Sequence, residues 1–148
     1  MNQFNRFNLP LCLVVEEGLF EHVDETVASY LPQIKGQKTI IVTEQFLSDL
    51  YPGYLAEIQR DFKDSEIYLS EEGSFDQAME LAKHICIQNI KVVIGFGGGR
   101  VLDVAKYAAF VSKAVYICLP TTLSNDSLAS PFLGMRSKFS IIIPPMES

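Results

Sequence analysis

The feature that most constrains the fold is an apolar run that leads directly into a glycine-rich segment and a helical pattern, KVVIGFGGGRVLDVAK over Lys91–Lys106. The β-branched run Val92–Ile94 is too short for a helix and uniform enough to be buried on both faces, which predicts a central parallel strand. Past the glycines, apolar residues recur at helical spacing, namely Val101, Leu102, Ala105, Ala108 and Ala109. The segment therefore predicts a strand, a glycine turn and a helix.

The glycine turn of Gly97, Gly98 and Gly99 is suited to hold a diphosphate. Glycine lets the backbone come close to a ligand, and a helix N-terminus presents unpaired amides and a partial positive charge. Three glycines can also form a tight connection and nothing more. The next apolar run, Val115–Leu119, opens into the hydroxyl-rich segment Pro120–Asp126. Because ligands of open α/β sheets bind beyond the carboxyl ends of strands, these two strand ends predict one polar crevice.

The rest of the chain predicts strands and helices in alternation. Further strands are expected at Leu11–Val15, Thr39–Val42, Glu66–Leu69 and Phe139–Ile143, and helices at 19–31, 46–62 and 75–88. Pro52 and Gly53 should interrupt the second helix, while Ser74 and Gln77 form a capping-box signature before the third. Regular alternation with right-handed crossovers implies one α/β domain over residues 1–148, a Rossmann-like parallel sheet with helices on both faces.

The composition of the chain excludes some classes of binding partner. The 148 residues carry a net charge of −6 without any Lys/Arg run, which argues against nucleic acid or an anionic membrane as the main partner. No apolar run approaches the roughly 20 residues of a membrane span. The three cysteines are odd in number and lie in apolar stretches, so we expect a cytoplasmic protein without disulfides. The two histidines lack partners at metal-ligand spacing, and small molecules or proteins remain as partners.

The motifs resemble the dehydroquinate synthase-like and iron-containing alcohol dehydrogenase superfamily. The residues that carry the resemblance are Gly97–Gly99, Asp103, Ala105, Lys106, Pro120–Thr122, Ser124, Asp126 and Ala129–Pro131. The pattern is nearest to the glycerol-1-phosphate dehydrogenase branch, although Asn125 and Ser127 stand where that branch has His and Gly. The resemblance covers the N-terminal, nucleotide-binding half of such an enzyme. It implies that the C-terminal helical domain, whose Asp and two His hold zinc or iron, is absent from this chain.

The resemblance also implies roles for individual residues. The cofactor-binding positions it implies are Glu44, Gly97, Gly98, Gly99, Asp103, Thr121, Thr122, Leu123 and Ser124. Glu44 would face the adenine ribose, where a carboxylate accepts from the 2′-hydroxyl and repels a 2′-phosphate, so NAD is favoured over NADP. Asp126 would face the substrate and Lys106 would lie near the nicotinamide. As alternatives, Asp126 makes an Asx turn and Lys106 forms a surface pair with Asp103.

The function implied is a metal-dependent, NAD(P)-linked dehydrogenase that interconverts dihydroxyacetone phosphate and glycerol 1-phosphate or a similar small polyol, and that forms homo-oligomers. Two alternatives stay open: a cyclase of the dehydroquinate synthase kind, and a nucleotide-binding module without catalysis. Arg100 stands in the first helical turn, where its charge opposes the helix dipole. It either reaches a phosphate of cofactor or substrate, or faces solvent.

Overall fold

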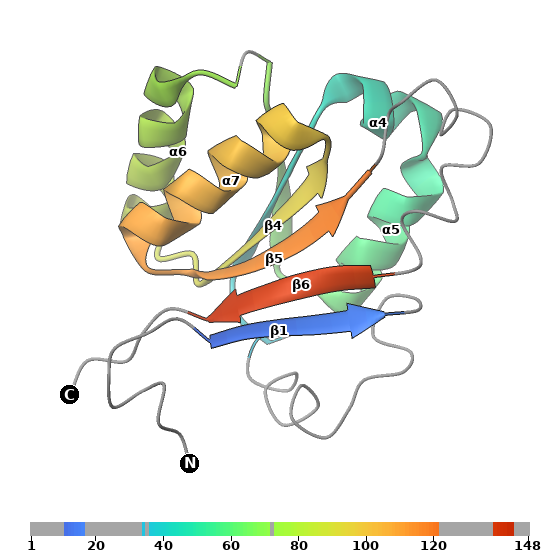
Figure 1. The fold of residues 1–148 in the computed structure, drawn as a ribbon, viewed down its shortest axis with the longest axis horizontal. Coiled ribbons are helices and arrows are strands. Elements are labelled where there is room, and N and C mark those ends of the chain that lie inside the picture. Colours follow the sequence, from blue (N-terminus) through green and yellow to red (C-terminus); the bar gives the residue numbers. More distant parts are fainter. Residues whose placement is uncertain (1–10, 17–33, 35, 72, 122–137, 144–148) are drawn as a thin grey trace.

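A computed structural model describes residues 11–16, 34, 36–71, 73–121 and 138–143, and these residues form a six-stranded sheet covered by helices (Figure 1). The strand order is β1-β6-β5-β4-β2-β3. The strands are β1 (Leu11–Glu16), β2 (Thr39–Thr43), β3 (Ser65–Leu69), β4 (Val92–Gly97), β5 (Val115–Pro120) and β6 (Lys138–Ile143). None of the described helices is long and apolar enough to cross a membrane.

Four neighbouring strands of the sheet are parallel, as the alternation of strands and helices predicted. β3 pairs with β2, β2 with β4, and β4 with β5, all in the same direction. β6 runs antiparallel to β5, and β1 runs antiparallel to β6, so the sheet as a whole is mixed. The sequence pattern predicted the positions of β1 and β6 correctly. It did not predict that β6 is antiparallel, because an apolar run carries no information about the direction of the strand relative to its neighbours.

The helices begin and end close to where sequence signals place them. The expected break at Pro52 separates α4 (Gln45–Leu50) from α5 (Pro52–Asp61), with proline in the first turn where its missing N–H is not needed. The third expected helix is α6 (Phe75–Ile87), and α7 (Gly99–Ser112) follows the glycine turn. The helix expected at 19–31 lies outside the described residues.

Helices cover both faces of the parallel strands, which gives the molecule two apolar cores (Figure 1). α4 and α5 pack on one face, where the core consists of Ile34, Ile41, Leu47, Tyr54, Leu55, Ile58, Phe62, Val92, Ile94, Phe96, Ile117 and Leu119. α6 and α7 pack on the other face, against side chains such as Ile40, Val42, Val93 and Tyr116. The central strands β2 and β4 are buried along their whole length, as expected for strands covered on both faces.

The predicted cap of α6 is present and extends into the preceding loop. The Ser74 hydroxyl accepts from the Gln77 N–H at 3.2 Å. The Gln77 side chain does not reach back to Ser74, as a capping box would require, but accepts from the Gly73 N–H at 3.0 Å and the Ser70 hydroxyl at 2.8 Å. Gln77 thus fixes the loop between β3 and α6, and the Ser70 N–H donates to the Thr43 carbonyl at 2.7 Å. The loop is therefore attached to the end of β2.

Candidate functional site

The carboxyl ends of β2, β4 and β5 meet around the glycine turn. Val42 pairs with Gly95 and Gly97 pairs with Pro120, so Glu44 and Thr121 follow their strands at nearly the same level. The Thr121 N–H donates to the Gly97 carbonyl at 2.9 Å, which ties the end of β5 to the turn. The structure thereby brings together the two strand ends that the sequence predicted to lie side by side, and it places the end of β2 next to them.

The three glycines of the turn have different structural roles. A Cβ at Gly97 would lie 3.0 Å from the Val101 Cβ and within 3.2 Å of both Val101 methyl carbons. Val101 is buried and β-branched, so it has little freedom to move away. The protein itself therefore requires glycine at position 97, whatever ligand binds.

Gly98 and Gly99 are not required by the packing around them. Among the described residues, a Cβ at Gly99 would meet nothing within 4 Å, and one at Gly98 would meet only the Glu44 Oε2, at 4.0 Å. Gly98 is the N-cap of α7 and no side chain caps the helix there. The first amides of a 14-residue helix are thus left without a capping side chain, as at sites that bind diphosphates.

Glu44 lies beside this helix N-terminus. It is the N-cap residue of α4, but its side chain makes no capping hydrogen bond to that helix. Its carboxylate approaches Gly98 instead, from the neighbouring strand of the sheet. An acidic side chain at the end of the strand next to a glycine turn has the geometry that recognises ribose hydroxyls in dinucleotide-binding sheets.

Gly95 and Tyr116 hold α7 close to the sheet. A Cβ at Gly95 would come within 3.0 Å of the Ala105 Cβ and 3.1 Å of the Tyr116 hydroxyl. That hydroxyl donates to the Leu102 carbonyl at 3.1 Å. Burial raises the pKa of Tyr116 well above its ordinary value, and the nearby charges of Cys118 and Asp103 add to the rise. Tyr116 is therefore a neutral donor that positions the first turns of α7.

Two buried hydroxyls at the carboxyl ends of the strands have no hydrogen-bond partner among the residues that the structure describes. They belong to Thr43, at the end of β2, and Thr121, just after β5. Side chains alternate along a strand, so Thr43 shares the sheet face of Ile41, and Thr121 that of Leu119. Buried polar groups are usually satisfied, and an orphaned one calls for an explanation such as a missing ligand. Sequence reasoning assigned Thr121 to the cofactor but gave Thr43 no role; a hydroxyl residue ending a buried strand was the available signal.

Asp103 and Lys106 lie on exposed positions of α7 and do not form an ion pair with each other. Asp103 is close enough to Tyr116 to influence its pKa. Thr122, Leu123, Ser124 and Asp126 lie outside the described residues, so the structure does not place them relative to the glycine turn.

Metal binding has no support among the residues that the structure describes. No group of three His, Cys, Asp or Glu side chains in those ranges could hold a metal ion. A catalytic zinc needs about three protein ligands. No chemical step is therefore assigned to a metal held by these residues.

These features define the chain as an α/β domain whose glycine turn lies at the carboxyl ends of the central parallel strands. Comparison with known proteins is more specific. The family described as iron-containing alcohol dehydrogenase matches residues 9–144, and the chain belongs to that family.

Enzymes named glycerol-1-phosphate dehydrogenase are among the relatives to which the chain is similar. The chain is 28% identical over 134 residues to glycerol-1-phosphate dehydrogenase [NAD(P)+] of Aeropyrum pernix, covering 90% of this chain and 38% of the relative. It is 29% identical over 133 residues to the enzyme of the same name from Thermofilum pendens, covering 88% of this chain and 36% of the relative. The chain thus spans less than two fifths of the length of these relatives.

Solved structures support the fold. Glycerol dehydrogenase from Schizosaccharomyces pombe superposes with a TM-score of 0.51 at 24% identity, covering 67% of this chain and 25% of that one. At this identity the likeness shows the fold alone. It agrees with the predicted α/β fold of a parallel sheet with helices on both faces.

Proposed function

We propose that this chain is the NAD(P)-binding α/β domain of a metal-dependent dehydrogenase that interconverts dihydroxyacetone phosphate and glycerol 1-phosphate or a similar small polyol. The observation that carries the proposal is the open N-terminus of α7 at Gly98 and Gly99, with the Glu44 carboxylate beside it. Membership of the iron-containing alcohol dehydrogenase family and similarity to enzymes named for glycerol 1-phosphate support the reaction class.

The glycine turn would bind the cofactor diphosphate. The backbone amides at Gly98 and Gly99 are the donors, and the absent side chains give the diphosphate room to approach. Gly97 contributes by letting the backbone turn closely over Val101. When bound, the nicotinamide cofactor supplies a hydride donor or acceptor for the carbonyl carbon of the substrate.

Glu44 would select between the two nicotinamide cofactors. Its carboxylate lies next to the diphosphate-binding turn, so an adenine ribose beyond the diphosphate comes within its reach. It accepts hydrogen bonds from the ribose hydroxyls of NAD and repels the 2′-phosphate of NADP. We therefore propose a preference for NAD with NADP still accepted.

The remaining residues extend the site from β5 toward the substrate. The unpartnered Thr121 hydroxyl is available to the cofactor, and Thr122, Leu123 and Ser124 would continue along it. Asp103 and Lys106 would lie at the nicotinamide end. Asp126 would face the substrate.

The metal and its ligands belong to the proposed second half of the protein. Zinc or iron would polarise the substrate oxygen as a Lewis acid, held by a C-terminal helical domain that is not among these 148 residues. The much greater length of the relatives supports this division. In the assembled protein we expect a homo-oligomer acting on a small phosphorylated ketone or polyol.

Binding and turnover test the two levels of the proposal separately. In calorimetry, NADH should release or absorb heat on binding to this chain and should raise its melting temperature. A chain that binds neither NADH nor NADPH contradicts the cofactor site. In steady-state assays with dihydroxyacetone phosphate, NADH and added zinc or iron, the chain alone should show no turnover. Turnover that persists in chelator would contradict the metal-dependent mechanism.

A further inference from the structure

The side chain of Arg100 lies along the loop between β3 and α6. A Cβ built at Gly73 would come within 3.1 Å of the Arg100 Cβ, 3.5 Å of its Cδ and 3.6 Å of its Cγ. The φ of Gly73 is +71°, a conformation that residues with side chains rarely adopt. The loop thus passes the arginine at a position where it has no side chain, and the aliphatic stem of the exposed arginine lies against Gly73.

This loop adjoins the end of β2 and therefore Glu44. The Ser70 N–H donates to the Thr43 carbonyl at 2.7 Å, and the Gln77 amide oxygen accepts from both Ser70 and Gly73. These bonds fix the loop, and with it Gly73, against which the stem of Arg100 lies. In the sheet, β3 is next to β2 on the side away from β4. Arg100 accordingly extends from the glycine turn toward the loop that follows β3, on the Glu44 side of the turn.

The charge of Arg100 has no structural use that the described residues reveal. No carboxylate in that part of the chain lies within 4.0 Å of its guanidinium, and in the first turn of α7 it opposes the helix dipole. Guanidinium groups bind phosphates through paired, charge-assisted hydrogen bonds. In dinucleotide-binding sheets, a carboxylate after the strand next to the glycine turn binds the ribose 2′-hydroxyl, and an arginine near it accommodates a 2′-phosphate.

We propose that Arg100 is the specificity residue for NADP, binding the 2′-phosphate of its adenosine ribose. The inference rests on the proposed cofactor site and adds a second determinant to it. Glu44, beside the α7 N-terminus, disfavours the 2′-phosphate, and Arg100, whose stem lies against Gly73 on the same side of the turn, offsets that repulsion. The two side chains together would let one site accept both NAD and NADP.

The test is a set of equilibrium binding measurements on this chain, with no turnover required. NAD, NADP, adenosine 5′-monophosphate and adenosine 2′,5′-bisphosphate are titrated into wild type, Arg100→Gln and Arg100→Lys. Arg100→Gln should weaken NADP and the bisphosphate by roughly tenfold to a hundredfold, the range expected for a charge-assisted hydrogen bond. It should leave NAD and the monophosphate within about twofold. Arg100→Lys should fall between, because it keeps the charge and loses the paired geometry.

Lys91→Gln is the matched control. Lys91 is an exposed cation that immediately precedes β4, at the opposite end of the strands from the glycine turn, so its removal changes the net charge equally. Lys91→Gln should change neither the ratio of NADP to NAD affinity nor the ratio of bisphosphate to monophosphate affinity. Equal weakening of NAD and NADP by Arg100→Gln would assign Arg100 to the diphosphate and overturn the inference, while leaving the cofactor site intact. An unchanged NADP affinity overturns it as well. Failure of wild type to bind any of the four ligands would remove both the inference and the cofactor site.

Discussion

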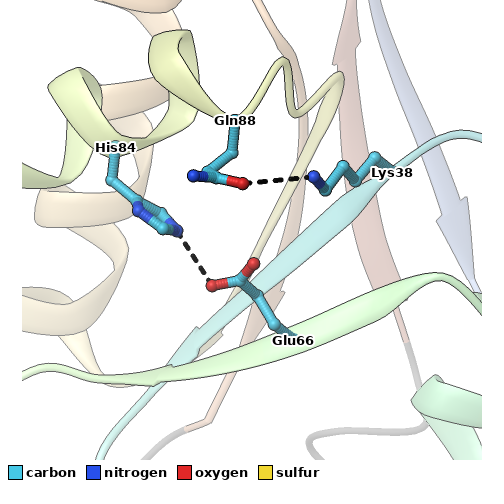
Figure 2. Close-up of polar contacts among 4 residues, drawn as sticks. All are labelled: Lys38, Glu66, His84 and Gln88. Carbon is cyan, nitrogen blue, oxygen red and sulfur yellow. Dashed lines mark hydrogen bonds and ion pairs between the residues drawn. The ribbon is translucent and has the colours of Figure 1, made fainter.

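The polar groups at the two ends of the parallel strands differ in whether they have hydrogen-bond partners within the described residues. At the amino ends, polar side chains satisfy one another: His84 Nε2 lies 2.9 Å from Glu66 Oε2, and the Lys38 ammonium donates to the Gln88 amide oxygen at 3.4 Å (Figure 2). At the carboxyl ends, the hydroxyls of Thr43 and Thr121 are buried without partners. Charge and polarity alone would mark both ends as candidate sites. The polar side chains at the amino ends hydrogen-bond to one another, whereas the two hydroxyls at the carboxyl ends do not, and this difference favours the carboxyl ends as the binding site.

The N-termini of α6 and α7 differ in the same way as the two ends of the strands. The N-terminus of α6 is capped by Ser74, and Gln77 fixes the loop before it, so its polar groups are engaged by the protein. The N-terminus of α7 starts at Gly98 with no capping side chain, although it is a helix of similar length. A glycine N-cap such as Gly98 gives up about a few tenths of a kcal/mol relative to Ser, Thr, Asn or Asp. The loss has a physical reason if a ligand anion takes the place of the cap.

The largest expected effect on the protein itself is at Gly97. Gly97→Ala places a Cβ 3.0 Å from the buried Val101 side chain and should lower the free energy of unfolding by about 1–3 kcal/mol, the usual range for overpacking. Urea unfolding followed by circular dichroism measures it. Gly53→Ala is the control, because a Cβ there meets nothing within 4 Å. If both variants are as stable as wild type, the close packing of the turn on Val101 is wrong.

A second effect concerns cofactor choice. Glu44→Gln keeps the size of the side chain and removes the charge that repels a 2′-phosphate, so the ratio of NADP to NAD affinity should rise roughly tenfold. Competition titrations on wild type and variant give the ratio. Asp49→Asn, an exposed acid on α4, is the matched control for net charge and should leave it unchanged. A ratio that stays constant in Glu44→Gln would show that Glu44 does not face the ribose.

A smaller effect is expected at Tyr116. Tyr116→Phe removes the hydrogen bond to the Leu102 carbonyl and should lower stability by about 1 kcal/mol near neutral pH. Because the pKa of Tyr116 is raised in the folded state, its contribution is complete below the unfolded value of roughly 10 and is lost as pH rises above it. The difference between wild type and variant should therefore shrink in alkaline solution. A difference that grows above pH 10 contradicts the neutral-donor role.

The smallest effect is expected at the amino end. Both partners of the His84–Glu66 pair are substantially exposed, at 40% and 45%, so His84→Ala should change stability by no more than about 1 kcal/mol. It should not change NADH affinity at all. A clear loss of cofactor binding in this variant would mean that the amino end is not merely a satisfied surface, and would break the contrast between the two ends.

Much of the fold could be predicted from the sequence, because its signals are local. The apolar run at Val92–Ile94, the glycines after it and the proline at position 52 each determine the structure of their own neighbourhood. The direction of β6 could not be predicted, since it depends on which neighbour the strand meets and not on its own residues.

The candidate site likewise has features that the sequence could predict and features that it could not. The glycines at 97 to 99 predicted a turn. The sequence could not show that packing against Val101 requires glycine at position 97 but not at positions 98 and 99. The orphaned hydroxyl of Thr43 and the contact between Gly73 and Arg100 were also hidden. Each is a property of side chains brought together from distant parts of the chain. The proposed roles of Thr122, Leu123, Ser124 and Asp126 stay predictions.

The central claim, that the open α7 N-terminus binds a dinucleotide, is tested most directly by titrating NADH into wild type and Gly99→Ala. A Cβ at Gly99 meets no other packed atom within 4 Å in the part of the chain that the structure describes, so the variant should be as stable as wild type. If the diphosphate approaches the backbone there, the added methyl group overpacks the site by about 1–3 kcal/mol and NADH affinity falls roughly tenfold or more. Equal NADH affinity in two equally stable proteins would contradict the claim.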